Sequence, residues 1–356
     1  MSQTKADHAV AIFIGIGIIM LIVQVLLGGV TRLTGSGLSI TEWDVLTGTV
    51  PPLTESTWLQ EFEKYQSTPQ YNYLNTAFTL QDFKFIYFWE WLHRFWARMI
   101  GVVFIIGFIY LLKKRYLHKR MQKPLLILFV LGALQGLVGW IMVQSGLTGD
   151  EVYVKPTRLA LHFIFAIGLI AYTYWFFLQL TIPASERKNL PPALRFTWIL
   201  LAVLFFQLIF GALMAGHKAA TAAPTWPDIN GDLLPAAAWS SWGLENFIAD
   251  KITVHFIHRT TGYMLLAGLI GFTVLLRRYI KGLRTLSRYY LAPVVLTLIQ
   301  VLLGIFSLLT SPRIVPNSWG LFETLALLHQ LTALLMVLSL ITLLFLISVK
   351  SYPPSS

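Results

Sequence analysis

The chain has 356 residues, of which 56% are hydrophobic and only 12% are charged, with a net charge of +11. This balance excludes a soluble globular domain, because apolar runs long enough to cross about 30 Å of hydrocarbon recur throughout the sequence. The absence of cysteine excludes disulfides, iron–sulfur clusters and thiolate metal sites. The positive charge gathers in short loops beside the apolar runs, which is typical of membrane topology, so we expect no nucleic-acid partner.

Eight apolar runs predict an all-α membrane protein with eight transmembrane helices. The runs cover roughly residues 10–30, 85–112, 125–144, 158–180, 196–216, 253–276, 291–310 and 321–348. Loops assigned to the side of the N-terminus hold most of the Lys and Arg residues and only Asp7 and Glu186 as acids. The positive-inside rule then predicts that both termini are cytoplasmic. Because the first run is too long for a signal-peptide core, we expect a multi-pass protein of the bacterial inner (plasma) membrane.

Equivalent features recur in the same order in the two halves of the chain, which indicates an internal duplication. His93-Arg94 near the start of the second run is matched by His258-Arg259 near the start of the sixth. We therefore predict two tandem, pseudo-symmetric four-helix bundles, formed by residues 1–182 and 183–356, each of which begins and ends on the same side.

The outer loops are longer than the inner ones. Residues 31–84 include the stretch 58–65, which predicts a short amphipathic helix lying on the bilayer surface. Residues 217–251 are rich in Ala, Trp and Pro. Long loops above a site commonly form its lid or wall, and we expect these two loops to do so.

A Gln-x3-Gly element recurs on the odd-numbered spans. Its four copies are Gln24–Gly28, Gln135–Gly139, Gln207–Gly211 and Gln300–Gly304. Two interpretations stay open at this point. Small residues and an amide favour close helix packing, whereas glycines also let a flat ligand lie against a helix.

One histidine lies near the outer end of each even-numbered span. These residues are His93, His162, His258 and His329. Two facing histidines in each half suit a porphyrin iron with two axial ligands. A carboxylate-bridged di-iron site is an alternative, because Glu90-x-x-His93 has its spacing, but the spans offer only Glu323 besides. A zinc hydrolase is less favoured, because no second Glu-x-x-His and no His-Glu-x-x-His motif is present.

The two halves differ beside these histidines. Glu90 lies one helical turn before His93, while His255 takes the corresponding position in the second half. A carboxylate can accept or steer protons, so we expect catalysis in the first half, and electron transfer or structural support in the second. An ion pair from Glu90 to a nearby arginine is the alternative. Arg94 and Arg259 are candidates for binding propionate groups, or for reaching lipid phosphate.

Several motifs resemble the haem A synthase family. They are Gly-Val-Thr-Arg-Leu-Thr-x-Ser-Gly-Leu-Ser at 29–39, Pro51-Pro52, Glu90-x-x-His93-Arg94, Thr225-Trp226-Pro227 and His258-Arg259. The resemblance implies that haem O is the substrate and that its C8 methyl group is oxidised stepwise to a formyl group, which yields haem A for terminal oxidases. It implies catalytic roles for Glu90, His93 and His162 at the substrate haem. It also implies that His258 and His329 ligate the iron of a haem b.

Each even-numbered span starts on the outer side, so the four histidines lie in the outer half of the membrane, and we expect the sites to face the periplasm. We expect haem O synthase, an unidentified electron donor and membrane lipid as partners. We also allow for a homo-oligomer. The cysteine pair in the first outer loop of some family members is missing, which excludes a thiol-based redox step there. Two alternatives remain at this point. One is a transmembrane di-haem b-type electron-transfer cytochrome without haem-modifying activity, and the other is a haem transporter or chaperone.

Overall fold

The computed structural model describes residues 5–43, 47–238, 243–315 and 318–348. Within these ranges the chain is helical and forms no β-strand, which confirms the predicted all-α class. Eight helices are long and apolar enough to cross a membrane, as predicted. The helices that form these spans are α1 (Lys5–Leu33), α4 (Leu80–Lys113), α5 (Lys119–Gln144), α6 (Pro156–Thr181), α7 (Pro191–Gly216), α9 (Lys251–Leu276), α11 (Ala292–Thr310) and α12 (Leu321–Ile347).

Most of these helices extend beyond the apolar runs, because polar residues at their ends continue or cap them. Helix α4 starts earlier than predicted, at Leu80, where Thr79 and Asp82 form a capping box. The Asp82 carboxylate accepts hydrogen bonds from the amide and the hydroxyl of Thr79, at 2.9 and 2.6 Å. Pro156 and Pro191 lie at the starts of α6 and α7, where the missing amide proton costs no intrahelical hydrogen bond.

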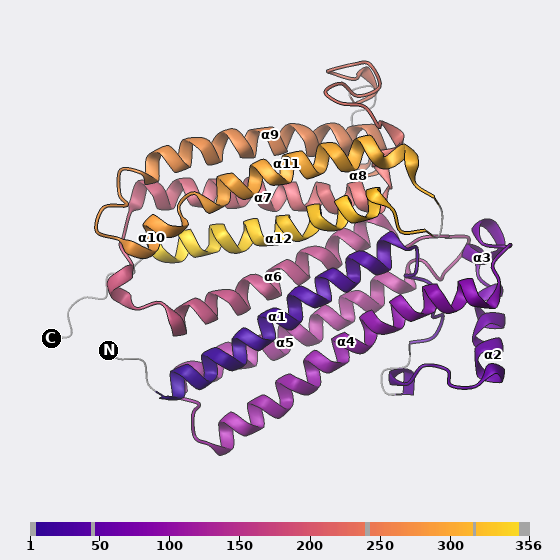
Figure 1. Ribbon diagram of the computed structural model, residues 1–356, viewed down its shortest axis with the longest axis horizontal. Coiled ribbons are helices and arrows are strands. Elements are labelled where there is room, and N and C mark those ends of the chain that lie inside the picture. The colour runs from indigo at the N-terminus through magenta and orange to yellow at the C-terminus, as the bar shows by residue number, and fades with distance from the viewer. Residues whose placement is uncertain (1–4, 44–46, 239–242, 316–317, 349–356) are drawn as a thin grey trace.

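Shorter helices lie at the two ends of the bundle. They are α2 (Glu55–Gln66), α3 (Pro69–Leu74), α8 (Leu244–Ala249) and α10 (Arg284–Tyr289). Single turns of 3-10 helix are η1 (Thr47–Thr49), η2 (Ala184–Glu186), η3 (Ala219–Ala222), η4 (Ala236–Ala238) and η5 (Ser311–Arg313). Figure 1 shows α2, α3 and α8 at one end and α10 at the other.

The predicted amphipathic helix forms as α2, within the long loop between α1 and α4. Phe62 and Tyr65 on its apolar side are buried. Both rings stack on Phe83 at the outer end of α4, with centroid distances of 5.1 and 5.3 Å. The apolar side of α2 is therefore covered by protein, whereas the sequence predicted that it lies on the bilayer surface.

The spanning helices form two groups of four, as predicted. Helix α1 packs on α4 and α6, and α5 packs on α6; in the second group α7 packs on α9, and α12 packs on α11. Figure 1 shows the second group stacked on the first. The groups meet through α1, α6, α7 and α12, and α12 is the most buried of the eight spans. Because this shared interface is broad, the independence of residues 1–182 and 183–356 as domains stays a prediction.

The linker between the two groups runs along the end of α12. The backbone amides of Lys188 and Leu190 donate to the carbonyl oxygens of Leu346 and Ile347, at 2.8 and 3.2 Å. The last carbonyls of a helix have no partner within the helix, so the linker satisfies them and is held in place by them. This contact keeps α6 and α7 beside the end of α12.

The first residue of α1 and the last residue of α12 lie at the same end of the bundle, opposite α2 and α3 (Figure 1). An even number of spans requires this arrangement. The assignment of that end to the cytoplasm stays a prediction from the distribution of Lys and Arg.

Candidate functional site

His93 lies on α4 with its ring against α1. The side-chain nitrogen of Gln24 lies 3.2 Å from Nδ1 and 3.4 Å from Nε2 of the ring. The same nitrogen donates to the backbone carbonyl of His93 at 3.3 Å, which fixes the orientation of the amide. Gly28 lies one turn further along α1, and a Cβ atom there would be only 3.0 Å from Cε1 of His93. Helix α1 therefore positions the imidazole of His93 in two ways. The side-chain amide of Gln24 contacts the ring, and Gly28, which has no side chain, leaves room for it.

His162 on α6 has the same surroundings on α5. The amide nitrogen of Gln135 lies 3.2 and 3.4 Å from its two ring nitrogens and donates to its backbone carbonyl at 3.2 Å. A Cβ atom on Gly139 would lie 2.9 Å from Cε1 of His162. The structure also brings His93 and His162 close enough to interact electrostatically.

The glycines of the second half repeat this arrangement. A Cβ atom on Gly211 would lie 3.1 Å from Cε1 of His258, and one on Gly304 would lie 3.0 Å from Cε1 of His329. All four Gln-x3-Gly elements are therefore built around a histidine. The sequence had left helix packing and ligand contact open as their purpose, and the structure shows that each glycine makes room for an imidazole.

The glutamines of the second half make different contacts. The side-chain oxygen of Gln207 accepts a hydrogen bond from Thr261 on α9. The backbone carbonyl of Gln300 lies 3.0 Å from Nδ1 of His329. A carbonyl can only accept, so Nδ1 of His329 carries the proton and Nε2 keeps its lone pair. That tautomer is the one in which Nε2 ligates a metal.

The rings of His258 and His329 face each other across the second half. Their centroids are 6.3 Å apart, with an angle of 71° between the ring planes. Two imidazoles that bind one metal from opposite sides, at about 2 Å each, place their centroids roughly 6 Å apart. The predicted pair therefore fits axial ligation of a haem iron.

The di-iron and zinc alternatives both need a set of side chains that binds a bare metal ion. The part of the chain that the structure describes contains no such set. No group of three or more His, Cys, Asp or Glu side chains is placed there to hold an ion. Glu323, the second carboxylate considered for a di-iron site, instead accepts from the backbone amide of Gly320 at 2.9 Å and caps α12.

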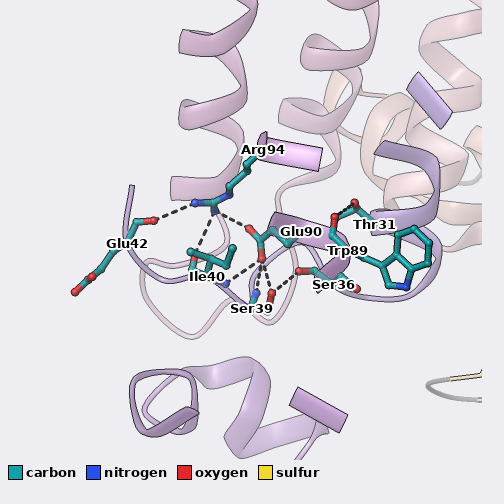
Figure 2. Close-up of polar contacts among 8 residues, drawn as sticks. All are labelled: Thr31, Ser36, Ser39, Ile40, Glu42, Trp89, Glu90 and Arg94. Atoms are coloured by element: carbon teal, nitrogen blue, oxygen red, sulfur yellow. Dashed lines mark hydrogen bonds and ion pairs between the residues drawn. The ribbon is translucent and has the colours of Figure 1, made fainter. Parts of the chain in front are cut away.

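Glu90 is almost completely buried, with 2% of its surface exposed. One carboxylate oxygen accepts from the amide and the hydroxyl of Ser39, both at 2.7 Å, and from the amide of Ile40 at 2.9 Å. The other oxygen pairs with Arg94 at 2.6 Å. Figure 2 shows these contacts converging on the carboxylate from the outer loop and from α4. The ion pair considered as an alternative role for Glu90 is therefore present.

Arg94 extends this network. Its guanidinium donates to the carbonyl oxygens of Glu42 and Ile40, at 3.0 and 3.2 Å, and lies 4.8 Å from the ring centroid of Trp43. Glu90 and Arg94 together hold Ser39, Ile40 and Glu42 against α4 (Figure 2). Sequence reasoning missed Ser39 and Ile40. The sequence signal that could have pointed to them is that Ser39 is the last residue of the motif at 29–39.

Arg94 also lines a cavity of about 390 Å³ beneath the outer loop. Arg98, one turn deeper on α4, contributes a second guanidinium, and Pro51 and Pro52 also line the cavity. The Pro-Pro motif and the arginines thus belong to one outer chamber. Binding of propionate groups by Arg94 stays a prediction.

Arg259 holds the second outer loop in a similar way. It donates to the carbonyl oxygens of Asp228 and Thr225, at 2.8 and 2.5 Å. The hydroxyl of Thr225 and the backbone amide of Gly231 hold the pKa of Asp228 below its usual range. The predicted propionate contact of Arg259 also stays a prediction, since the structure shows loop carbonyls as its partners.

His255 does not repeat the contacts of its counterpart Glu90. It is buried, with 1% of its surface exposed, and its Nδ1 forms no hydrogen bond with any described residue. Among the described residues, only those of the first half tie the outer loop to the second helix of the half through a buried carboxylate. The sequence difference between the halves is also a structural difference.

Comparison with known proteins identifies relatives over nearly the whole chain. The model of the cytochrome oxidase assembly protein family (COX15-CtaA) matches residues 11–343. A heme A synthase of Bradyrhizobium sp. (strain ORS 278) is 42% identical over 345 residues, covering 94% of this chain and 90% of the relative. Heme A synthases of Flavobacterium johnsoniae and Paracoccus denitrificans are 38% and 36% identical. They cover 93% and 92% of this chain and 97% and 85% of their own lengths.

Proposed function

This chain belongs to the cytochrome oxidase assembly protein family, and on that basis we propose that it is a haem A synthase, a membrane enzyme that oxidises haem O. The observation that supports this most strongly within the molecule is the set of four equivalent histidine sites, two in each half, each built on a Gln-x3-Gly element. Two such pairs are suited to two porphyrins, one of which is the substrate.

We assign the substrate haem O to the first half. His93 and His162 are held there by side-chain amides, and Glu90 lies one helical turn from His93, where the second half has His255. The proposed reaction oxidises the C8 methyl group in steps, first to a hydroxymethyl group and then to a formyl group. Written with water as the oxygen source, the methyl group and one water yield the formyl group, four protons and four electrons, and an external electron acceptor takes up the electrons. Glu90 and Arg94 hold Ser39 and Ile40 against α4, which would limit the access of bulk water to a porphyrin bound at His93 and His162.

Glu90 is our candidate for proton transfer in the first half. Its carboxylate already accepts three hydrogen bonds and one ion pair, so moving a proton requires that it release one of these donors. The hydroxyl of Ser39 can rotate away without disturbing the backbone, which makes it the donor that is easiest to release.

The second half is proposed to hold a haem b between His258 and His329. A haem held by these two residues would supply one-electron transfer. The residues of the chain contribute the ligands, and the carbonyl of Gln300 sets the tautomer of His329. Glycines 211 and 304 keep both rings close to their supporting helices.

We further propose that the protein lies in the bacterial inner membrane with both sites towards the periplasm. Haem O synthase would deliver the substrate, and a separate electron donor or acceptor would exchange electrons with the second half. A homo-oligomer is compatible with this arrangement, because α4 is largely unburied along its span.

The test is to express the chain together with a haem O synthase and to separate the extracted haems by chromatography. Haem A should accumulate with the wild-type chain and not with a His93→Ala variant. Haem O that stays unmodified, in membranes where the protein carries haem and is reduced and reoxidised, would identify a di-haem electron-transfer cytochrome instead.

A further inference from the structure

A second chamber lies at the opposite end of the molecule from the histidines. It has a volume of about 320 Å³ and lies between the two groups of helices. Its walls come from the last turns of α6, from the short helix α10 and from α12. Figure 1 shows α10 at the end where α1 starts and α12 finishes, which the positive-inside rule assigns to the cytoplasm.

The mouth of this chamber is cationic. Arg284 and Arg288 both line it, lie one turn apart on α10 and are exposed. Within the described residues neither guanidinium forms an ion pair. Glu186 is an acid that interacts with Arg284, and it accepts from the backbone amide of Thr285 at 2.9 Å. The amide and the hydroxyl of Thr285 hold the pKa of Glu186 below its usual range, with a smaller contribution from Arg284, so the mouth carries two positive charges and one negative charge.

The inner wall of the chamber is apolar and aromatic. Phe177 and Leu178 on α6 contribute hydrocarbon surface, and Tyr289 on α10 lies beside the arginines. Deeper inside, the hydroxyl groups of Tyr174 and Thr342 are 2.8 Å apart and join α6 to α12. A cationic mouth above an apolar wall, at the level where membrane aromatic residues gather, matches the amphipathic shape of a phospholipid.

We propose that this chamber binds the phosphate of an anionic phospholipid, with Arg284 and Arg288 as its ligands and α6 and α12 as the wall for the first part of the acyl chains. A lipid bound there contacts both helix groups and stabilises their interface. This site is separate from haem chemistry and does not depend on the proposed function.

The test uses the full-length protein in nanodiscs of phosphatidylcholine alone or of equal parts phosphatidylcholine and phosphatidylglycerol. Native mass spectrometry after release from the discs counts the anionic lipids that stay bound. Replacing both arginines (Arg284→Ala with Arg288→Ala) should lower the retained phosphatidylglycerol roughly 10-fold. The pair Arg284→Lys and Arg288→Lys should retain most of it, because the charge remains.

The matched control is Arg277→Ala with Arg278→Ala, which removes two exposed arginines from the same end of the molecule that do not line the chamber. It should retain phosphatidylglycerol like the wild type. Equal losses in the two alanine pairs, or no loss in either, would overturn the proposal.

A second measurement separates lipid from free phosphate. In detergent, added phosphatidylglycerol should raise the Tm of the wild type but not that of the Arg284→Ala, Arg288→Ala protein. Inorganic phosphate should have little effect on either. An equal rise with inorganic phosphate would make the chamber a small-anion site and would contradict a lipid ligand.

Discussion

At the scale of single residues, the histidine sites depend on glycines, which have no side chain, as much as on the histidines themselves. Each of the four histidines lies against a glycine, at distances where an added methyl group would collide with the ring. An imidazole that ligates a metal needs its ring plane and tautomer fixed by its surroundings. The glycine fixes how closely the ring approaches the helix, and the glutamine four residues earlier contacts the ring or the neighbouring turn.

Two glycines on α5 allow this role to be measured. The change Gly139→Ala places a Cβ atom 2.9 Å from Cε1 of His162, so the ring must move, at a cost of about 1–3 kcal/mol. We expect haem A production to fall sharply while haem b stays bound. Gly136→Ala on the same helix meets nothing within 4 Å and should leave haem A production unchanged. Equal activity in the two variants would show that the glycine is not needed to position His162.

Glu90 permits a second prediction at this scale. Glu90→Gln keeps the size of the side chain but removes the charge that pairs with Arg94. The protein should fold, insert and keep haem b, yet accumulate haem O or a hydroxymethyl product, with a loss of roughly 10²–10⁴-fold in haem A formation. Haem chromatography and the haem b spectrum measure both effects.

The control for that change is Glu63→Gln on α2, which removes an exposed carboxylate of the same loop that does not line the chamber beneath it. It should cost little, because substitutions at exposed surface positions rarely change stability by more than about 0.5 kcal/mol. Near-normal haem A from Glu90→Gln would leave Glu90 with only the structural role of holding residues 39–40.

At the scale of elements, α4 links the membrane site to the outer loop. Its outer end carries Phe83, on which α2 packs, and about two turns deeper Glu90 and Arg94 bind residues 39–43. The outer region is thus held by an apolar contact and by a polar network on one helix. Because α2 is short, it depends on this packing for its stability.

Phe62→Ala tests that dependence. Loss of the buried ring costs about 3–5 kcal/mol locally, which exceeds the stability of a helix as short as α2. Amide exchange in α2 should therefore increase strongly, while exchange in α9 should not change. Leu59→Ala on the same helix, where the side chain is 51% exposed, is the control and should have little effect. Protected amides in α2 of the Phe62→Ala protein would mean that other contacts hold it.

At the scale of the whole molecule, direct contacts hold the two halves in register. Arg32 at the end of α1 donates to the carbonyl of Ala215 at the end of α7, at 2.7 Å. Gln330 on α12 donates to the carbonyl of Val25 on α1 at 3.0 Å. Both contacts involve α1, which carries a Gln-x3-Gly element. They therefore fix the position of one histidine pair relative to the other.

The two halves should respond differently to loss of a histidine. His258→Ala or His329→Ala should remove most copurifying haem b, because the pair that fits two axial ligands is broken. His93→Ala or His162→Ala should keep that haem and stop haem A formation. His118→Ala, whose side chain makes no capping hydrogen bond at the start of α5, serves as the control. An unchanged haem spectrum in all four site variants would assign the histidines to structure alone.

Much of this architecture follows from the sequence by itself. Eight spans, the duplication and the four histidines could be predicted, because hydrophobic length and residue spacing are local properties of the chain. The family resemblance rested on short motifs of the same local kind. The pairing of His258 with His329 also followed, since the repeat placed one histidine on each alternate helix.

Only the tertiary structure decided what these residues contact. Glu90 meets the amide of Ser39, which is 51 residues earlier in the chain, and no periodic pattern predicts where a loop will return. The purpose of the Gln-x3-Gly elements and the protein contact of α2 were likewise undetermined, because each depends on the face that a neighbouring helix presents. The chamber between α6, α10 and α12 exists only where the two halves meet. Contacts between distant segments depend on the packing of whole helices, and that packing is not a local property of the sequence.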